Sequence, residues 1–271
     1  MSSPSALPSR LSIVVPAYNE EKTVATVTER LLLVEHLYEI IIVDDCSTDN
    51  TSVVARRLAE RHPQVRVIRH ERNGGKTAAL KTGFAATTGD IVIVQDADLE
   101  YDPAEIGDVI QPIAAGFADV VYGSRFLVRK AARVLYFYHF LANKSLTFFS
   151  NLLTNVNFSD IETGYKAFRG DIIRNMVITS SGFGFEIEVT AKISKLGCIA
   201  YEVPISYYGR TYEQGKKIGV KDGLLALWYI VRYNLFTSLR DSYRVIPSSR
   251  PDDLQPLNAR AASASGKHNA G

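Results

Sequence analysis

The sequence is poor in cysteine and carries little net charge. Its 271 residues include two cysteines, Cys46 and Cys198, and have a formal net charge of +2. The cysteines lie far apart, in or beside apolar stretches. They form no ligand cluster, and buried thiols in a reducing compartment are expected. The small net charge gives no reason to expect a nucleic-acid partner.

Long apolar stretches are also missing. Residues 134–142 are interrupted by His139, and residues 224–231 are followed by Arg232. Neither stretch approaches the ~20 apolar residues that a membrane-spanning helix needs, so we expect a protein that lies on a membrane at most. Residues 1–10 are rich in Ser and Pro without an apolar core, so no signal peptide is predicted. We expect residues 1–9 and the Pro/Ser/Ala-rich residues 246–271 to be disordered.

The central part of the chain alternates between two kinds of pattern. Short apolar stretches predict strands, and stretches with apolar residues three or four positions apart predict helices between them. The predicted strands are residues 11–16, 39–43, 65–69, 91–94 and 119–122. This alternation predicts an α/β protein with a doubly wound, mostly parallel sheet flanked by helices. At 46% hydrophobic residues the chain can bury a sizeable core.

The pattern changes after Arg125. One or two aromatic-rich helices are expected over residues 134–156, a polar loop with a short strand over 160–169, and a helix over 185–196. A strand over 199–203, a Gly/Lys loop over 210–219 and a last amphipathic helix over 222–239 complete the expected elements.

Two aspartates directly follow one of the predicted buried strands. In an extended chain residues i and i+2 point to the same side, so Asp96 and Asp98 are expected to bring two carboxylates together. Such a pair needs a cation or a shared proton, and its hard oxygen atoms suit Mg²⁺ or Mn²⁺ together with substrate phosphates. A polar turn that caps the helix near Asp102 is the alternative. Other acidic and loop residues, 16–20 and 44–45, also follow strands, at the edge where such sheets bind ligands.

Two glycine-rich stretches do not match nucleotide-binding motifs. Residues 72–77 contain a Gly-Lys-Thr sequence, but the earlier position where a phosphate-binding loop would need a glycine is His70. A turn that opens a helix is therefore predicted at residues 72–77. Residues 182–184 lack the third glycine of a dinucleotide fingerprint and do not follow a clear strand.

Several short segments occur in an order that resembles a known family. Residues 15–20, 43–51, 73–76, 96–98 and 123–125 together resemble the GT-A glycosyltransferases of family 2. Residues 162–169 and 210–217 resemble the polyprenyl-phosphate, dolichol-phosphate mannose synthase-like branch of that family. The resemblance spans about residues 10–240. It implies one GT-A nucleotide-diphospho-sugar transferase domain over residues 10–240, with C-terminal amphipathic helices.

The resemblance also implies roles for the matching residues. A nucleotide-sugar would contact Pro16, Tyr18, Glu20, Val43, Asp45, Asp96, Ala97, Asp98 and Arg125. The metal would be held by Asp96 and Asp98, with Glu100 at a position where relatives commonly have a metal-binding Gln. Diphosphate or acceptor phosphate would contact Arg125, Arg210, Lys216 and Lys217. The expected catalytic residues are Asp98, Arg125 and Asp160.

The implied reaction is an inverting transfer of a sugar from a nucleotide-sugar to a polyprenyl phosphate, with Mg²⁺ or Mn²⁺. The donor is left open between GDP-mannose and a UDP-hexose or UDP-N-acetylhexosamine. A phosphate acceptor is largely ionised at pH 7 and hardly needs a general base. We therefore expect Asp160 to position substrate or a basic side chain, with a capped turn as the alternative. A hydroxyl acceptor on a saccharide or small metabolite, or a non-catalytic sugar-nucleotide-binding protein, are the other functions considered.

The aromatic-rich helices have two interpretations. Residues 131–157 and 222–239 could pack as ordinary core. Alternatively they could lie on anionic lipid, since Arg129, Lys130 and Arg133 flank the first of them. We expect a peripheral protein at the cytoplasmic face of a membrane. It would attach directly or through a membrane-protein partner, and a homo-oligomer is left open.

Overall fold

The computed structural model describes residues 9–127, 136–209 and 220–247, with the backbone alone described for residues 220–222. Most of the two predicted disordered ends and the predicted loop 210–219 lie outside these residues. So do Arg129, Lys130 and Arg133, which were expected to flank a membrane-interface helix.

The described residues form one seven-stranded sheet in the order β3-β2-β1-β4-β6-β5-β7. The strands are β1 (Leu11–Ala17), β2 (Leu37–Asp44), β3 (Val65–Arg69), β4 (Ile91–Val94), β5 (Val120–Ser124), β6 (Lys166–Arg169) and β7 (Ala200–Pro204). Only β6 runs antiparallel to its two neighbours, β4 and β5. The predicted doubly wound, mostly parallel sheet is therefore confirmed.

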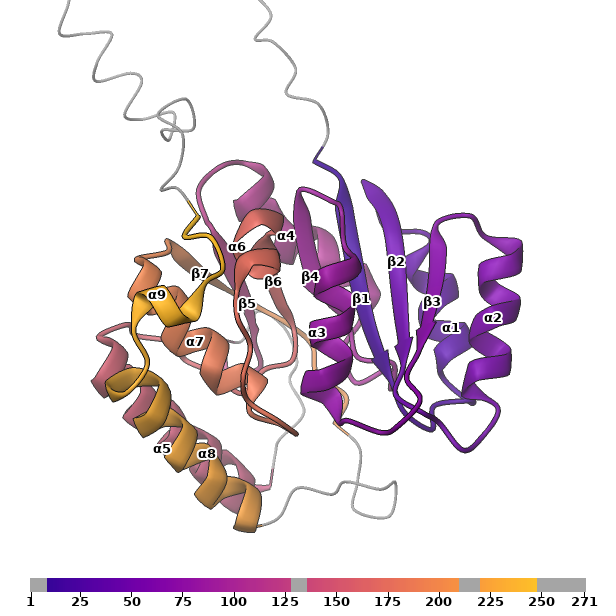
Figure 1. Cartoon of the computed structure of the whole chain (residues 1–271). Helices are drawn as coiled ribbons and strands as arrows, with labels where there is room; N and C mark the ends of the chain where they lie inside the picture. Colours follow the sequence, from indigo (N-terminus) through magenta and orange to yellow (C-terminus); the bar gives the residue numbers. More distant parts are fainter. Residues whose placement is uncertain (1–8, 128–135, 210–219, 248–271) are drawn as a thin grey trace, which may run out of the picture.

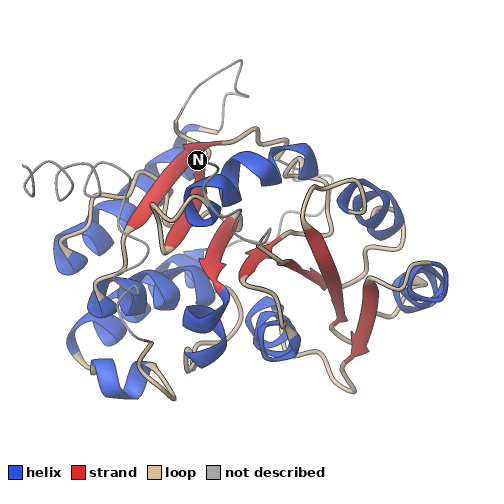
Figure 2. Cartoon of the chain, turned by 90° about the horizontal axis from the view of Figure 1, so that it is seen from above, coloured by secondary structure: helices blue, strands red, loops and turns tan. Residues whose placement is uncertain are grey.

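Helices cover both faces of the sheet (Figures 1 and 2). They are α1 (Val24–Leu31), α2 (Thr51–Arg61), α3 (Lys76–Ala86), the 3₁₀ turn η1 (Pro103–Glu105), α4 (Ile106–Ala114), α5 (Phe137–Thr154), α6 (Gly170–Asn175), α7 (Phe185–Leu196), α8 (Val220–Leu235) and α9 (Leu239–Ser242). Alternate strand residues face opposite layers: Ile13 and Ile93 pack with α1, α2 and α4, whereas Val14 and Val94 pack with α3, α7 and α8. Both faces are buried, as a parallel sheet requires.

The C-terminal region differs from the prediction in detail. The helix expected over 222–239 ends at Leu235 and is followed by α9, a separate short helix. Ser238 and Asp241 form a capping box that starts α9, which explains why the longer helix does not continue.

The two cysteines are free and only partly buried, rather than buried as expected. None of the helices in the described ranges combines the length and the hydrophobicity that a transmembrane span requires.

Sharp turns follow three neighbouring strands at the carboxyl edge of the sheet. Asn19, Cys46 and Leu99 lie just beyond β1, β2 and β4, and their φ angles are 57°, 62° and 62°. Positive φ is uncommon outside glycine and marks a place where the surrounding structure constrains the backbone. These turns bring the three loops together at the edge where ligands bind in such sheets.

Candidate active site

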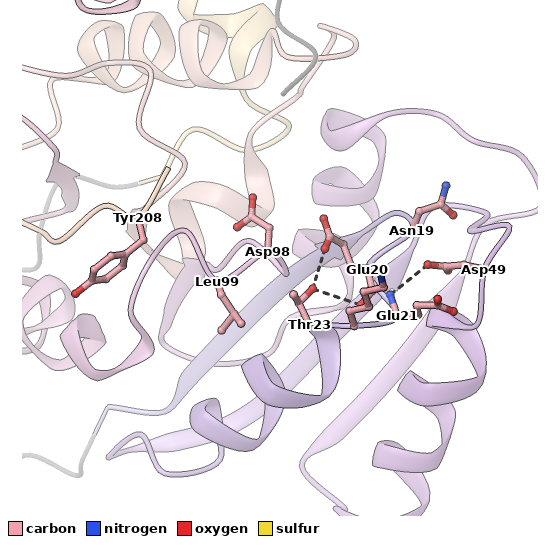
Figure 3. A pocket seen from close by; sticks show the side chains of 9 residues that line it. Asn19, Glu20, Glu21, Thr23, Asp49, Asp98, Leu99 and Tyr208 are labelled. Atoms are coloured by element: carbon pink, nitrogen blue, oxygen red, sulfur yellow. Dashed lines mark hydrogen bonds between the residues drawn. The ribbon is translucent and has the colours of Figure 1, made fainter. Parts of the chain in front are cut away.

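A pocket of about 550 Å³ lies at this edge (Figure 3). The loops after β1, β2, β4 and β7 contribute its lining: Asn19, Glu20, Glu21, Lys22, Thr23, Asp49, Asp98, Leu99 and Tyr208. Two of the predicted donor-binding residues, Glu20 and Asp98, are in this lining. The other lining residues were not predicted as site residues, because nothing in the sequence indicates that Asp49 or Tyr208 lies beside the β1 and β4 loops.

Hydrogen bonds tie the first two loops into one wall of the pocket. The backbone N–H of Asn19 donates to the Ser47 hydroxyl (3.0 Å), and that of Glu20 donates to the Thr51 hydroxyl (2.8 Å). The Thr23 hydroxyl donates to Glu20 Oε2 (2.7 Å), which fixes the carboxylate beside the pocket (Figure 3). These contacts hold Glu20 in place before any ligand binds.

The remaining predicted nucleoside residues do not line the pocket. Tyr18 is 43% exposed and Pro16 is partly exposed, so the side chains of both are accessible to a ligand. Val43 and Ala97 are buried, which leaves their backbone as the part able to contact a ligand. Their contacts with a nucleotide stay predictions.

Asp45 holds the turn that precedes α3. Its carboxylate accepts hydrogen bonds from the backbone N–H groups of Gly74 (3.0 and 3.1 Å) and Gly75 (2.7 Å). His70 Nδ1 lies 2.6 Å from Asp45 Oδ1. This local role accounts for the burial of Asp45, and its predicted contact with a base or ribose stays a prediction.

Asp96 pairs with a lysine rather than with Asp98. Strand β4 ends at Val94, so the extended geometry expected to align the two aspartates does not apply. Lys76 Nζ lies 2.9 Å from Asp96 Oδ1 and 3.0 Å from Oδ2. It also lies 3.4 Å from Glu186 Oε1. Burial would lower the pKa of Lys76, but Asp96 and Glu186 outweigh burial and raise it above its usual value.

Lys76 was missed as a site residue, although the segment 73–76 was noted. Gly164 approaches the Lys76–Asp96 pair so closely that a Cβ there would lie 2.7 Å from Asp96 Oδ2 and 3.0 Å from Lys76 Nζ. The signal that could have found Lys76 is a lysine at the start of a helix beside the predicted acidic edge.

The three predicted metal ligands have different neighbours. Asp98 Oδ1 accepts from the Glu100 backbone N–H (3.1 Å), and Glu100 Oε2 accepts from the Tyr207 hydroxyl (2.9 Å). Among the residues that the structure describes, no three His, Cys, Asp or Glu side chains form a ready metal-binding group. Metal coordination by Asp96, Asp98 and Glu100 stays a prediction that would need ligands from the substrate.

Arg125 and Asp160 form a buried ion pair. Arg125 Nε donates to Asp160 Oδ2 (2.7 Å) and Nη2 donates to Oδ1 (2.8 Å), while the Arg125 backbone N–H also donates to Oδ2 (3.2 Å). Burial would raise the pKa of Asp160, but the charge and hydrogen bonds of Arg125 lower it overall. The guanidinium also stacks on the Tyr207 ring, 5.2 Å from its centroid. Two of the three predicted catalytic residues, Arg125 and Asp160, are thus in direct contact.

A second buried acid lies in the same loop as Asp160. Burial, with the nearby Glu186 charge, raises the pKa of Glu162 to about 7. Burial lowers the pKa of Lys166 to about 8, and its ammonium donates to the Ile161 carbonyl (2.8 Å). Glu162 Oε1 and Glu186 Oε2 are buried, and no described residue forms a hydrogen bond with either atom. Neither glutamate was predicted as a site residue, because their proximity depends on how α7 packs.

The predicted phosphate ligands Arg210, Lys216 and Lys217 lie outside the described residues.

The fold matches solved structures of one enzyme class. Glucosyl-3-phosphoglycerate synthase from Mycobacterium tuberculosis, in complex with Mn²⁺, uridine diphosphate and phosphoglyceric acid, is similar with a TM-score of 0.66. It is 20% identical, and the match covers 85% of this chain and 80% of that one. Its complex with uridine diphosphate alone gives the same TM-score over 96% of this chain and 98% of that one. The chain therefore has the GT-A glycosyltransferase fold, as predicted.

Residues 12–176 match the domain described as glycosyl transferase family 2. Because this match covers more than half of the 271 residues, the chain belongs to glycosyl transferase family 2. The family predicted from the sequence segments is confirmed.

The sequence is also similar to those of curated proteins from other organisms. Dolichol-phosphate mannosyltransferase of Pyrococcus furiosus is 30% identical over 77% of this chain, and the match spans 60% of that protein's length. Polyprenol monophosphomannose synthase of Mycolicibacterium smegmatis is 29% identical over 78% of this chain and 82% of its own. Dodecaprenyl-phosphate galacturonate synthase of Rhizobium johnstonii is 27% identical over 82% of this chain and 68% of its own.

Proposed function

We propose that this glycosyltransferase moves a sugar from a nucleotide-sugar donor to a polyprenyl phosphate with inversion at the anomeric carbon. The observation that carries the proposal is the likeness, over more than three quarters of the chain, to enzymes named for polyprenyl-phosphate products. Those names include both mannose and galacturonate, so the likeness supports a lipid-phosphate acceptor and leaves the sugar open.

The pocket supports a nucleotide-sugar donor held with a divalent cation. Asp98 lies in its lining, and Asp96 is close in sequence, so hard carboxylate oxygens are present at the carboxyl edge of the sheet. Mg²⁺ is usually held by one or two carboxylates plus substrate phosphates, which fits a site without a complete protein cage. Asp96 and Asp98 would hold the ion, with Glu100 next to them. When bound, the ion would neutralise charge on the departing nucleoside diphosphate.

The Arg125–Asp160 pair supports an ionised phosphate acceptor. The low pKa of Asp160 and its two side-chain bonds to Arg125 make it a poor proton acceptor. Asp160 instead fixes the guanidinium, whose planar group suits bidentate contact with a phosphate. Since a phosphomonoester has a second pKa of ~6, it attacks without help from a base. Asp160 would thus position Arg125 for the acceptor.

The surface of α5 and α8 supports a membrane-bound acceptor. The two helices pack side by side (Figure 1). Large apolar side chains are exposed along both helices and at the residue after α8: Phe137, Tyr138, Leu141, Phe148, Phe149, Leu152, Leu224, Trp228, Leu235 and Phe236. Residues 136–159 and 223–240 contain no Asp or Glu. An apolar surface with only basic charges suits the interface of an anionic membrane, so we propose peripheral attachment there.

Transfer of label into a lipid tests the proposed reaction. Purified protein is incubated with undecaprenyl phosphate, Mg²⁺ or Mn²⁺, and labelled GDP-mannose, UDP-glucose or UDP-N-acetylglucosamine in separate reactions. Label from one donor should move into the organic phase and disappear when the cation is chelated. Asp98→Asn should abolish the transfer, whereas Asp108→Asn on the exposed surface of α4 should not. Transfer only to water-soluble acceptors would instead identify a hydroxyl acceptor, and no transfer from any donor would contradict an enzyme.

A further inference from the structure

The ammonium of Lys76 lies where a cation held by Asp96 would lie. Its Nζ is nearly equidistant from the two carboxylate oxygens, at 2.9 and 3.0 Å. This symmetrical position is the one that a bidentate cation takes on a carboxylate. Because a lysine is ordinarily protonated near neutral pH, this contact is an ion pair.

The position of Lys76 is built by the ends of two helices. Lys76 is the first residue of α3, and Glu186 is the second residue of α7. The backbone N–H and the hydroxyl of Thr77 both donate to the Gly182 carbonyl (3.1 and 2.8 Å), which ties the two helix starts together. The Lys76 ammonium is therefore presented to Asp96 by fixed backbone, not by a mobile surface chain.

A second acceptor for the same ammonium is already in place. Glu186 Oε1 is 3.4 Å from Lys76 Nζ, and Glu186 Oε2 is buried with no hydrogen-bond partner in the part of the chain that the structure describes. A small shift of the ammonium away from Asp96 would bring it fully onto Glu186. Asp96 would then be released while the lysine stays neutralised, so neither charge would be buried alone.

We propose that Lys76 is a positioning residue that occupies Asp96 in place of the divalent cation until the donor arrives, and then moves to Glu186. This inference rests on the proposed function, because it assumes that Asp96 takes part in holding the metal. Its consequence is that the cation binds poorly by itself and binds well together with the nucleoside diphosphate, whose oxygens add the missing ligands.

Binding of Mn²⁺ to the full-length protein, followed by electron paramagnetic resonance of the free ion, tests this without turnover. Without nucleotide, Lys76→Met should bind Mn²⁺ about tenfold more tightly than the unchanged protein, since a competing cation is gone. Lys81→Met removes an exposed lysine from the same helix and should change nothing. Adding uridine or guanosine diphosphate should strengthen Mn²⁺ binding more in the unchanged protein than in Lys76→Met. Equal or weaker binding by Lys76→Met without nucleotide would overturn the inference.

A second variant decides the matter if Lys76→Met does not fold. Glu186→Gln removes the alternative acceptor, so Lys76 should stay on Asp96 and Mn²⁺ should bind more weakly than in the unchanged protein. Unchanged Mn²⁺ affinity in Glu186→Gln would overturn the inference. The proposed function is tested by a different measurement. An absence of sugar transfer would contradict the proposed function, whatever the Mn²⁺ affinities of these variants are.

Discussion

At the scale of single residues, Arg125 and Asp160 depend on each other. Both side chains are largely buried, and Asp160 is fully so. Removing one partner of a buried ion pair leaves the other charge uncompensated, which typically costs about 3–5 kcal/mol. We expect Asp160→Asn to lower the free energy of unfolding by a few kcal/mol in urea titrations and to weaken acceptor binding together with turnover.

The same variant separates positioning from proton removal. If Asp160 acts through Arg125, affinity for polyprenyl phosphate should fall while affinity for the nucleotide-sugar changes little. Arg57→Gln on α2 serves as a control, because it removes an exposed positive charge outside the Arg125–Asp160 pair. Loss of turnover with donor and acceptor binding both intact would show instead that Asp160 is the catalytic base.

The sequence predicted which edge of the sheet carries the acidic residues, but it did not predict the contacts that these residues make. Glu20 and Asp98 were correctly placed near one another, because residues after neighbouring parallel strands meet at one edge. The pairing of Asp96 with Lys76 was not predicted, since it joins residues 20 positions apart through the geometry of two loops. The assumption of an extended chain failed there because β4 ends at Val94, and Leu99 adopts a positive φ.

At the scale of elements, the exposed face of α5 should contact lipid. Phe148 and Leu152 are 62% and 66% exposed and lie four residues apart, on one face of the helix. Replacing both by Ser should reduce flotation with anionic vesicles, while the urea midpoint changes little because neither side chain is buried. Leu33→Ser removes an apolar side chain that is 84% exposed on another surface, and flotation should persist. Equal flotation of all three proteins, or none by the unchanged protein at low salt, would contradict direct attachment.

Elements could be predicted where burial alone determines them. Residues 91–94 are apolar throughout because β4 is covered on both faces, and such a run predicts a strand without knowledge of its neighbours. The place of β6 between β4 and β5 was not predicted, because strand pairing depends on contacts such as Ile93 with Ala167 that are distant in sequence. The capping box at Ser238 is the sequence signal that separates α9 from the end of the longer helix.

At the scale of the whole molecule, one buried carboxylate joins several strands. Glu39 in β2 accepts from the Ser12 hydroxyl of β1 (2.8 Å) and from Arg66 Nη1 of β3 (3.0 Å). It also accepts from the backbone N–H of Thr88, just before β4 (2.7 Å). The amino ends of four adjacent strands are thus held through this one side chain.

The ionisation of Glu39 should therefore couple the stability of the sheet to pH. Burial would raise the pKa of Glu39, but its hydrogen bonds outweigh burial and lower the pKa below the ordinary value of 4.5. A depressed carboxylate pKa stabilises the folded state at pH values above the unfolded-state pKa. This contribution is lost as the pH falls through the folded-state pKa.

Urea titrations between pH 7 and pH 3 test this dependence. We expect the free energy of unfolding to decrease once the pH is lower than about 4.5. Glu39→Gln should be less stable at pH 7 and should lose less stability on acidification, whereas exposed Glu60→Gln should follow the unchanged protein. Parallel curves for Glu39→Gln and the unchanged protein would show that the strands do not depend on this charge.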